Sequence, residues 1–143
     1  METPPPTITL HASCVAVGAR AVLILGRSGA GKSALALQLI GLGARLVADD
    51  RTILTATPEG LIASAPEPIR GLIEARFVGL LRADPCDASP VALAVDLDQA
   101  ETERLPPRRE ARFLEHPVPL LHRVDWPYFA AAILIHLTHG RAE

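Results

Sequence analysis

The stretch from Gly26 to Ile40, GRSGAGKSALALQLI, constrains the fold more than any other part of this sequence. Its first eight residues match the pattern GxxxxGK[ST] at every defined position. A short apolar run, AVLIL, precedes the motif, and a run with helical spacing follows it, as a phosphate-binding loop requires. We therefore predict a P-loop made of Gly26, Arg27, Ser28, Gly29, Ala30, Gly31, Lys32 and Ser33.

The residue types of this P-loop indicate how it would hold a nucleotide. Glycines let successive backbone N–H groups converge on phosphate oxygens, and the N-terminus of the following helix adds partial positive charge. Lys32 is the only lysine of the chain, and its ammonium group would reach the outer phosphates. The Ser33 hydroxyl would bind Mg²⁺. The sequence therefore predicts a bound nucleotide and Mg²⁺.

Length and composition exclude several other classes of protein. A chain of 143 residues, 49% of them hydrophobic, is expected to form one domain with a substantial core. The net charge is −2, and no basic stripe with interleaved aromatic residues suggests nucleic-acid binding. No apolar run is long enough to span a membrane, and the N-terminus lacks the features of a secretory signal. Cys14 and Cys86 have no metal-site spacing, so we interpret them as reduced thiols in a cytoplasmic protein.

The order of the expected elements indicates an α/β or α+β sheet domain. Residues 1–7 are expected to be a disordered lead, and residues 8–143 a single domain. We predict helices over 32–43, with Leu35, Leu39 and Leu42 on one face, and over 125–140, with Asp125 as N-cap. Strands are expected over 7–17, 21–25, 45–50, 52–57, 61–65 and 90–97, and residues 111–121 are expected to be extended.

Two aspartates, Asp49 and Asp50, end the strand that follows the P-loop helix. The carboxyl ends of neighbouring strands face the ligand crevice of an open α/β sheet. Because side chains alternate along a strand, only one of the two carboxylates is expected to face the phosphates. The alternative is that the pair begins a solvated turn. Taken alone, Glu74 would be a surface carboxylate, and His11 a histidine within an apolar strand.

These features occur together, and in this order, in one known family. The segment 11–50 closely resembles the start of the catalytic domain of bacterial HPr kinase/phosphorylase, with its histidine, its P-loop and its Asp pair. The segment GLIEARFVGLL resembles the family's signature, and ETERLP resembles its Asp-Arg-Leu segment. The likeness extends over residues 8–140 and implies the P-loop kinase fold that this family shares with phosphoenolpyruvate carboxykinase. It also implies homo-oligomers, since the known enzymes are hexamers.

The resemblance implies a protein kinase. Enzymes of this family use ATP to phosphorylate a seryl hydroxyl of the phosphocarrier protein HPr, and they can reverse the reaction by phosphorolysis. The residues that the resemblance carries over are the base Asp50 with its neighbour Asp49, Lys32 for charge balance, Ser33 and Glu74 for Mg²⁺, His11 beside the base, and Arg104 beside the transferring group.

Two positions and one segment depart from the family pattern. Ala34 follows the loop serine where glutamate is common, and Phe77 replaces a glycine of the signature. The segment HPVPLLHRVDWP stands where the family has Pro-Gly-Arg-Asn, which serves dephosphorylation, and the resemblance places Arg123 at the arginine of that segment. This departure affects phosphorolysis more than the kinase reaction. Two other functions therefore stay open. One is a non-catalytic nucleotide-sensing module, and the other is a small-metabolite kinase, for which 143 residues leave little room.

Overall fold

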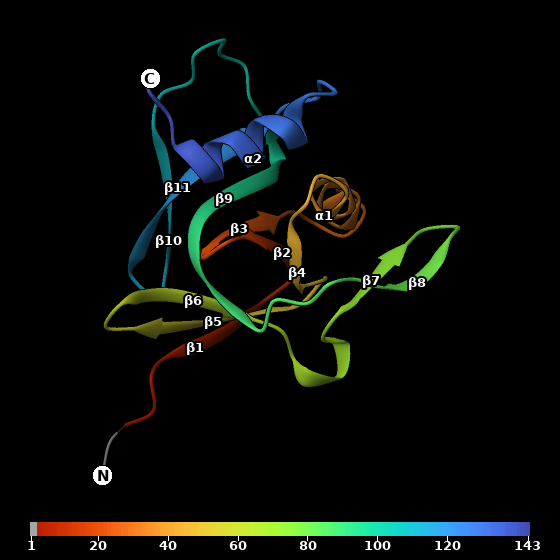
Figure 1. Ribbon diagram of the computed structural model, residues 1–143. Coiled ribbons are helices and arrows are strands. Elements are labelled where there is room, and N and C mark those ends of the chain that lie inside the picture. The colour runs from red at the N-terminus through yellow and green to blue at the C-terminus, as the bar shows by residue number, and fades with distance from the viewer. Residues whose placement is uncertain (1–2) are drawn as a thin grey trace.

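The computed structural model describes residues 3–143, and its centre is a sheet that both helices cover on one face (Figure 1). The helices are α1 (Lys32–Gly41) and α2 (Phe129–His139), and a 3₁₀ turn spans Glu67–Ile69. The strands are β1 (Thr7–Leu10), β2 (Ala12–Val17), β3 (Arg20–Leu25), β4 (Arg45–Ala48), β5 (Thr52–Thr57), β6 (Gly60–Ser64), β7 (Leu72–Ala75), β8 (Gly79–Arg82), β9 (Ala88–Ala100), β10 (Arg109–Phe113) and β11 (His116–Arg123).

The long strand β9 joins the two halves of the sheet. Its first residues pair antiparallel with β6, whereas its later residues pair parallel with both β3 and β11. The strand order is β1-β5-β6-β9-β3-β2-β4, with β10 and β11 branching from β9. β2 is antiparallel to both β3 and β4, so β3, β4 and β9 run in one direction. Their carboxyl ends therefore lie along one edge of the sheet, where the P-loop follows β3.

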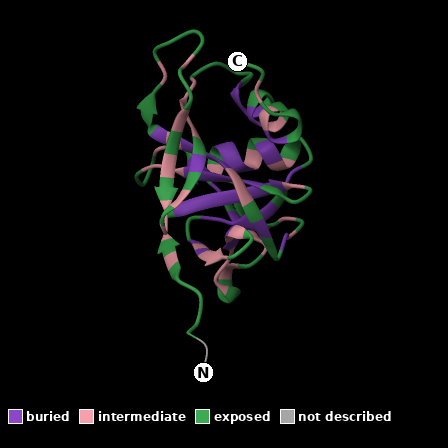
Figure 2. Ribbon diagram, turned by 90° about the vertical axis from the view of Figure 1, so that its left-hand side faces the viewer, coloured by how far each residue is buried: buried purple, intermediate pink, exposed green. Residues whose placement is uncertain are grey.

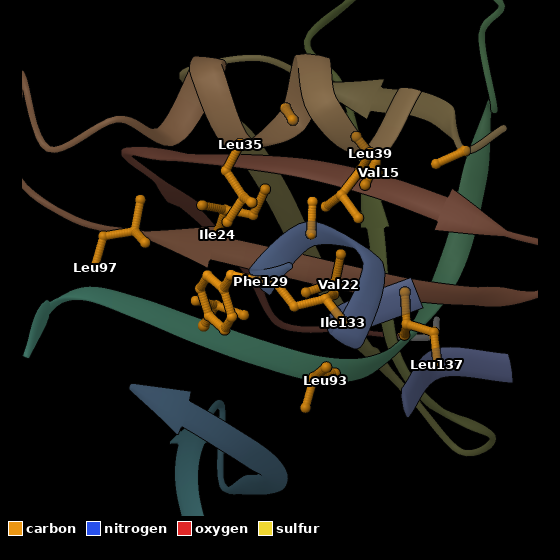
Figure 3. Close-up of a cluster of buried hydrophobic side chains, with 14 of the residues drawn as sticks. Val15, Val22, Ile24, Leu35, Leu39, Leu93, Leu97, Phe129, Ile133 and Leu137 are labelled. Carbon is orange, nitrogen blue, oxygen red and sulfur yellow. The ribbon is translucent and has the colours of Figure 1, made fainter. Parts of the chain in front are cut away.

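The central strands are buried on both faces, which is why β3 is almost wholly apolar. Val22 and Ile24 of β3 pack against the two helices, whereas Leu23 packs toward the β5–β6 hairpin on the opposite face. Figure 3 shows the first group between the strands and the helices, together with Phe129 and Ile133 of α2. Buried residues run through the middle of the molecule, and exposed ones gather in its outer loops (Figure 2). This core holds the end of β3 and the start of α1 in place.

The strand before the P-loop, the helix after it and the hairpin over 52–64 confirm the sequence predictions. The single strand predicted over 7–17 is wrong, because the chain bends at His11 between β1 and β2. β1 pairs with β5, while β2 pairs with β3 and β4, so the two strands need different directions. Part of the predicted lead, residues 1–2, lies outside the described residues. Thr7 is not part of a disordered lead, because it already pairs with Thr55.

The boundaries of both helices differ from the prediction. α2 begins at Phe129 with Tyr128 as its N-cap, and the Asp125 carboxylate instead accepts a bond of 2.9 Å from Arg123 Nε. α1 ends at Gly41, so Leu42 lies past the buried face and is 50% exposed. Neither helix within residues 3–143 has the length and apolarity that a membrane crossing requires.

The two cysteines are free, which agrees with the interpretation of them as reduced thiols, and both are buried. Cys14 lies in β2 and Cys86 lies between β8 and β9, and both belong to the core on the face opposite the helices. Burial raises the pKa of the Cys14 thiol far above its ordinary value, so this thiol stays protonated and behaves as a small apolar side chain.

Candidate active site

The P-loop wraps around the ammonium group of Lys32. Gly31 stands before α1 with a φ of 104°, a left-handed conformation that suits glycine. The Ala30 N–H donates to the Arg27 carbonyl at 3.0 Å, which closes the turn of the loop. Lys32 Nζ donates to the carbonyls of Gly26 at 2.6 Å and Arg27 at 3.0 Å, and the residue is only 6% exposed. The loop and the first turn of α1 thus form one unit.

The Asp49 carboxylate lies just beyond β4 and accepts hydrogen bonds from the P-loop, from β2 and from β7. Its Oδ1 accepts bonds from the Ser33 hydroxyl at 2.6 Å and from the Ser13 hydroxyl at 2.9 Å. Its Oδ2 accepts a bond of 3.2 Å from the backbone N–H of Glu74. Asp49 is only 9% exposed. This aspartate is therefore the one of the pair that contacts the P-loop serine.

Asp50 lies in different surroundings from its neighbour. Its backbone is left-handed, with φ at 67°, and its carboxylate lies 2.5 Å from His11 Nε2. The side chains of Asp50 and His11 are 60% and 51% exposed. His11 lies at the bend between β1 and β2, with its imidazole beside Asp50. An exposed carboxylate bonded through one oxygen keeps its other oxygen for a substrate proton.

Ser13 links the two aspartates, and sequence reasoning missed it. Its hydroxyl donates to Asp49 and accepts a bond of 3.1 Å from the backbone N–H of Asp50. Ser13 is fully buried in β2. A buried hydroxyl needs partners, so a serine inside the apolar run ASCVAV was the available signal.

Asp98 is a second residue that sequence reasoning missed. It follows Asp96 near the end of β9, and its two carboxylate oxygens accept from the backbone N–H of Arg27 at 3.2 and 3.1 Å. The signal was the pattern AVDLD, an apolar strand that ends in acidic residues as the strand before Asp49 does.

Of two further predicted site residues, Glu74 is bonded to Asp49, whereas Arg104 lies in another part of the molecule. Glu74 lies on β7 with its side chain exposed, and its backbone N–H is bonded to Asp49. Arg104 lies in the loop after β9, where it lines a cavity of about 780 Å³ with Trp126 and His136. No residue of the P-loop lines this cavity. The structure thus brings Glu74 to the site and leaves Arg104 outside it.

The loop that carries Arg104 is held by an ion pair. Arg109 donates to the two carboxylate oxygens of Glu101 at 3.2 and 3.1 Å. These bonds hold the pKa of Glu101 below its usual range. Across the same cavity, burial lowers the pKa of His136, and the positive charges of nearby arginines, Arg141 among them, add to that effect. Charged groups therefore line part of this cavity, whose lining contains no residue of the P-loop.

The oxygen groups at Ser33 and Asp49 suit Mg²⁺. This ion prefers hard oxygen ligands and commonly takes one or two carboxylates together with substrate phosphates. Within residues 3–143, no group of three or more His, Cys, Asp and Glu side chains converges as a metal site. Ser33 and Asp49, which lie together at the start of α1, are the residues that would hold the ion from the protein side. The ion would supply neutralisation of phosphate charge, and Lys32 would add to it.

These elements define a class of protein. A P-loop at the carboxyl edge of a mixed α/β sheet, with a buried aspartate on its serine, is typical of P-loop kinase folds. Residues 4–86 match the family model of the HPr Serine kinase C-terminal domain, which covers more than half of the chain. The chain belongs to this family.

Curated relatives and a solved structure agree with that assignment. The chain is 49% identical over 77 residues to the HPr kinase/phosphorylase of Thermoanaerobacter sp., a match that covers 53% of this chain and 25% of that protein. It is 47% identical over 77 residues to the HPr kinase/phosphorylase of Bordetella pertussis, with the same coverage. It thus matches only about a quarter of the length of these relatives.

The likeness in structure extends further along the chain. It covers 90% of this chain and 86% of the HPr(Ser) kinase/phosphatase of Coxiella burnetii, with a TM-score of 0.72 and 27% identity. The mixed α/β fold is therefore that of the HPr kinase C-terminal domain, as the sequence predicted.

Proposed function

We propose that this chain is a protein kinase domain that transfers a phosphoryl group from ATP to a seryl hydroxyl of the phosphocarrier protein HPr. The observation that carries the proposal is that two adjacent aspartates lie in different surroundings. Asp49 is buried on the P-loop serine, and Asp50 is exposed beside His11. The names of the matched relatives support HPr as the partner. ATP and Mg²⁺ are the cofactors that this reaction requires.

In this proposal the P-loop and Lys32 bind and orient the phosphates, and Ser33 with Asp49 holds Mg²⁺. The free carboxylate oxygen of Asp50 takes the proton of the attacking seryl hydroxyl as the new O–P bond forms and the bond to ADP breaks. The contact with His11 fixes the position of the Asp50 carboxylate. Proton transfer by a positioned carboxylate contributes about 10²–10⁴ to a rate. Glu74 is a further candidate for the metal side of the site, because its backbone contacts Asp49.

The reverse reaction, phosphorolysis, would use the same groups, with Asp50 returning the proton. Arg123, the equivalent of the family's arginine for this reaction, donates to the Leu97 carbonyl at 2.7 Å and to Asp125 at 2.9 Å. Both contacts hold it to the end of β9 and the start of the α2 segment. We therefore base the proposal on the kinase direction and treat phosphorolysis as a second measurement in the same assay.

A nucleotide-sensing module without turnover is the second candidate. The observation that favours it concerns Phe77, which occupies the position of a glycine in the family pattern. Phe77 has a φ of 70° and is fully exposed. A sensing module needs the P-loop but has no use for an exposed carboxylate paired with His11. A cytoplasmic location and assembly into homo-oligomers stay predictions from the sequence and the resemblance.

The deciding experiment incubates the purified chain with radiolabelled ATP, Mg²⁺ and HPr from the same organism. We expect phosphoserine on HPr and its loss when HPr with an alanine at the acceptor serine is used. If the chain binds ATP in a titration but labels no HPr, the kinase proposal fails and the sensing module replaces it. Inorganic phosphate added to labelled HPr then measures phosphorolysis.

A further inference from the structure

We infer that Asp98 is a positioning residue that orients the first peptide of the P-loop, and through it the ammonium group of Lys32. The inference deepens the proposed function and rests on its claim that the P-loop binds ATP. It concerns a carboxylate at the end of β9, on the side of the loop opposite to Asp49 and Asp50 in the strand order.

The register of the sheet brings Asp98 to the loop. β9 runs parallel to β3, and Leu25, the last residue of β3, lies beside Asp96. Two residues further on, Asp98 is therefore level with the entry to the P-loop. The backbone N–H of Asp98 donates to Asp96 Oδ1 at 2.9 Å, which holds this end of β9 in shape.

The contact with the loop is made by the carboxylate. Both oxygens of Asp98 accept from the backbone N–H of Arg27, at 3.2 and 3.1 Å. The Arg27 guanidinium is 3.9 Å from the same carboxylate, with its side chain 86% exposed, so the backbone bonds dominate. The Asp98 side chain is 38% exposed, so these bonds lie at the surface of the molecule.

The peptide bond between Gly26 and Arg27 is held from both sides. It is trans, so its carbonyl and its N–H point in opposite directions. The N–H is bonded to Asp98, and the Gly26 carbonyl accepts a bond of 2.6 Å from Lys32 Nζ. Turning this peptide over would break both contacts together. Asp98 therefore helps to decide where the Lys32 ammonium lies.

β9 approaches the first residue of the P-loop closely. A Cβ atom at position 26 would lie 2.9 Å from Ala30 Cβ, 3.3 Å from Leu97 Cβ and 3.7 Å from Asp98 Oδ1. Glycine is thus required at this point not only for the loop but also for its contact with β9. The loop is therefore pinned to β9 as well as to β3.

Two substitutions at Asp98 separate its hydrogen bonds from its charge. Asp98→Asn keeps an acceptor for the Arg27 N–H and removes the negative charge, whereas Asp98→Ala removes both. Asp84→Ala is the matched control, because Asp84 is an exposed aspartate paired with Arg45 at 3.3 Å and contacts no P-loop residue. The Kd for ATP is measured by titration calorimetry with Mg²⁺ and without HPr.

We expect Asp98→Ala to raise the Kd for ATP about tenfold, and Asp98→Asn to keep it within about threefold of wild type. In the HPr assay, Asp98→Ala should raise KM for ATP with kcat nearly unchanged, whereas a loss of folded protein would lower kcat and leave KM. If Asp98→Ala binds ATP as tightly as wild type, or more tightly, or if Asp98→Asn weakens binding as much as Asp98→Ala does, the hydrogen bonds to Arg27 do not orient the loop and the inference is overturned.

The design keeps the inference separate from the proposed function. ATP binding is measured without HPr, so a wild-type chain that binds ATP but labels no HPr overturns the kinase proposal and not the role of Asp98. Conversely, labelling of HPr by the wild type together with unchanged ATP binding by Asp98→Ala overturns the role of Asp98 and leaves the kinase proposal standing.

Discussion

Asp49 and Asp50 are neighbours in the chain and opposites in their surroundings. Asp49 is 9% exposed and accepts hydrogen bonds from three groups on three different elements. The Asp50 side chain is 60% exposed and contacts His11. The left-handed backbone at Asp50 turns its side chain away from that of its neighbour. The comparison teaches that two identical side chains, adjacent in the chain, can occupy opposite environments, one buried among hydrogen-bond donors and one open to solvent.

Removing the buried carboxylate should have the largest effect. Asp49→Ala leaves the hydroxyls of Ser13 and Ser33 without their acceptor, and an unpaired buried polar group costs about 1–3 kcal/mol. We expect the free energy of unfolding in urea to fall by about 2–4 kcal/mol. Mg²⁺ should no longer strengthen ATP binding. Asp87→Ala, an exposed aspartate paired with Arg70, is the control and should lose under about 1 kcal/mol.

Asp50→Asn should have the opposite pattern of effects to Asp49→Ala, with a large loss of rate and little change in stability. Its side chain is exposed, so the free energy of unfolding should change by less than about 1 kcal/mol. The rate of HPr phosphorylation should fall by about 10²–10⁴ because the base is lost, while the Kd for ATP stays within about threefold. A variant that phosphorylates HPr at the wild-type rate would remove Asp50 from the role of base.

Glu74→Gln tests whether a third carboxylate of the site supports Mg²⁺ binding, as Asp49 is proposed to do. Its backbone contacts Asp49, but its side chain is exposed. If the carboxylate supports Mg²⁺, the substitution should weaken Mg²⁺-dependent ATP binding about tenfold, with no change when Mg²⁺ is absent. An unchanged dependence on Mg²⁺ would remove Glu74 from the metal site.

Phe77→Gly should have the smallest effect, and it should be favourable. Like Asp50, Phe77 has a left-handed backbone, with a φ of 70°. Its side chain is fully exposed, so its removal costs no buried contacts. Glycine relieves the strain at some cost in chain entropy, so the free energy of unfolding should rise by about 0.5 kcal/mol. A lower stability would mean that the exposed ring contributes contacts in solution, as an oligomer would provide.

Local patterns predicted the P-loop, the strand before it and the helix after it, because each of these depends on neighbours in the chain. The same patterns placed Leu42 and Asp125 wrongly. Leu42 fits the helical spacing but lies beyond the end of α1, and Asp125 has a side chain suited to an N-cap but is paired with Arg123. Helix ends depend on which competing partner a side chain finds, and spacing does not contain that information.

The candidate site shows the same division. The sequence predicted the P-loop and the Asp pair of the site, and the comparisons confirm the family to which the sequence pointed. It did not show that Ser13 joins the two aspartates, that Asp98 contacts Arg27, or that Arg104 lies in a separate cavity. These contacts join residues distant in the chain.

By itself, the sequence determined the phosphate-binding loop, the buried central strands and the presence of two aspartates at the end of β4. Periodicity and motif spacing are local properties, so a single chain displays them directly. Only the tertiary structure decided which aspartate is buried and which is open. That choice depends on the bend at His11, the left-handed turn at Asp50 and the strand that brings Ser13 between them. Each of these is set by pairing between strands distant in the sequence, where backbone hydrogen bonds and burial override local preference.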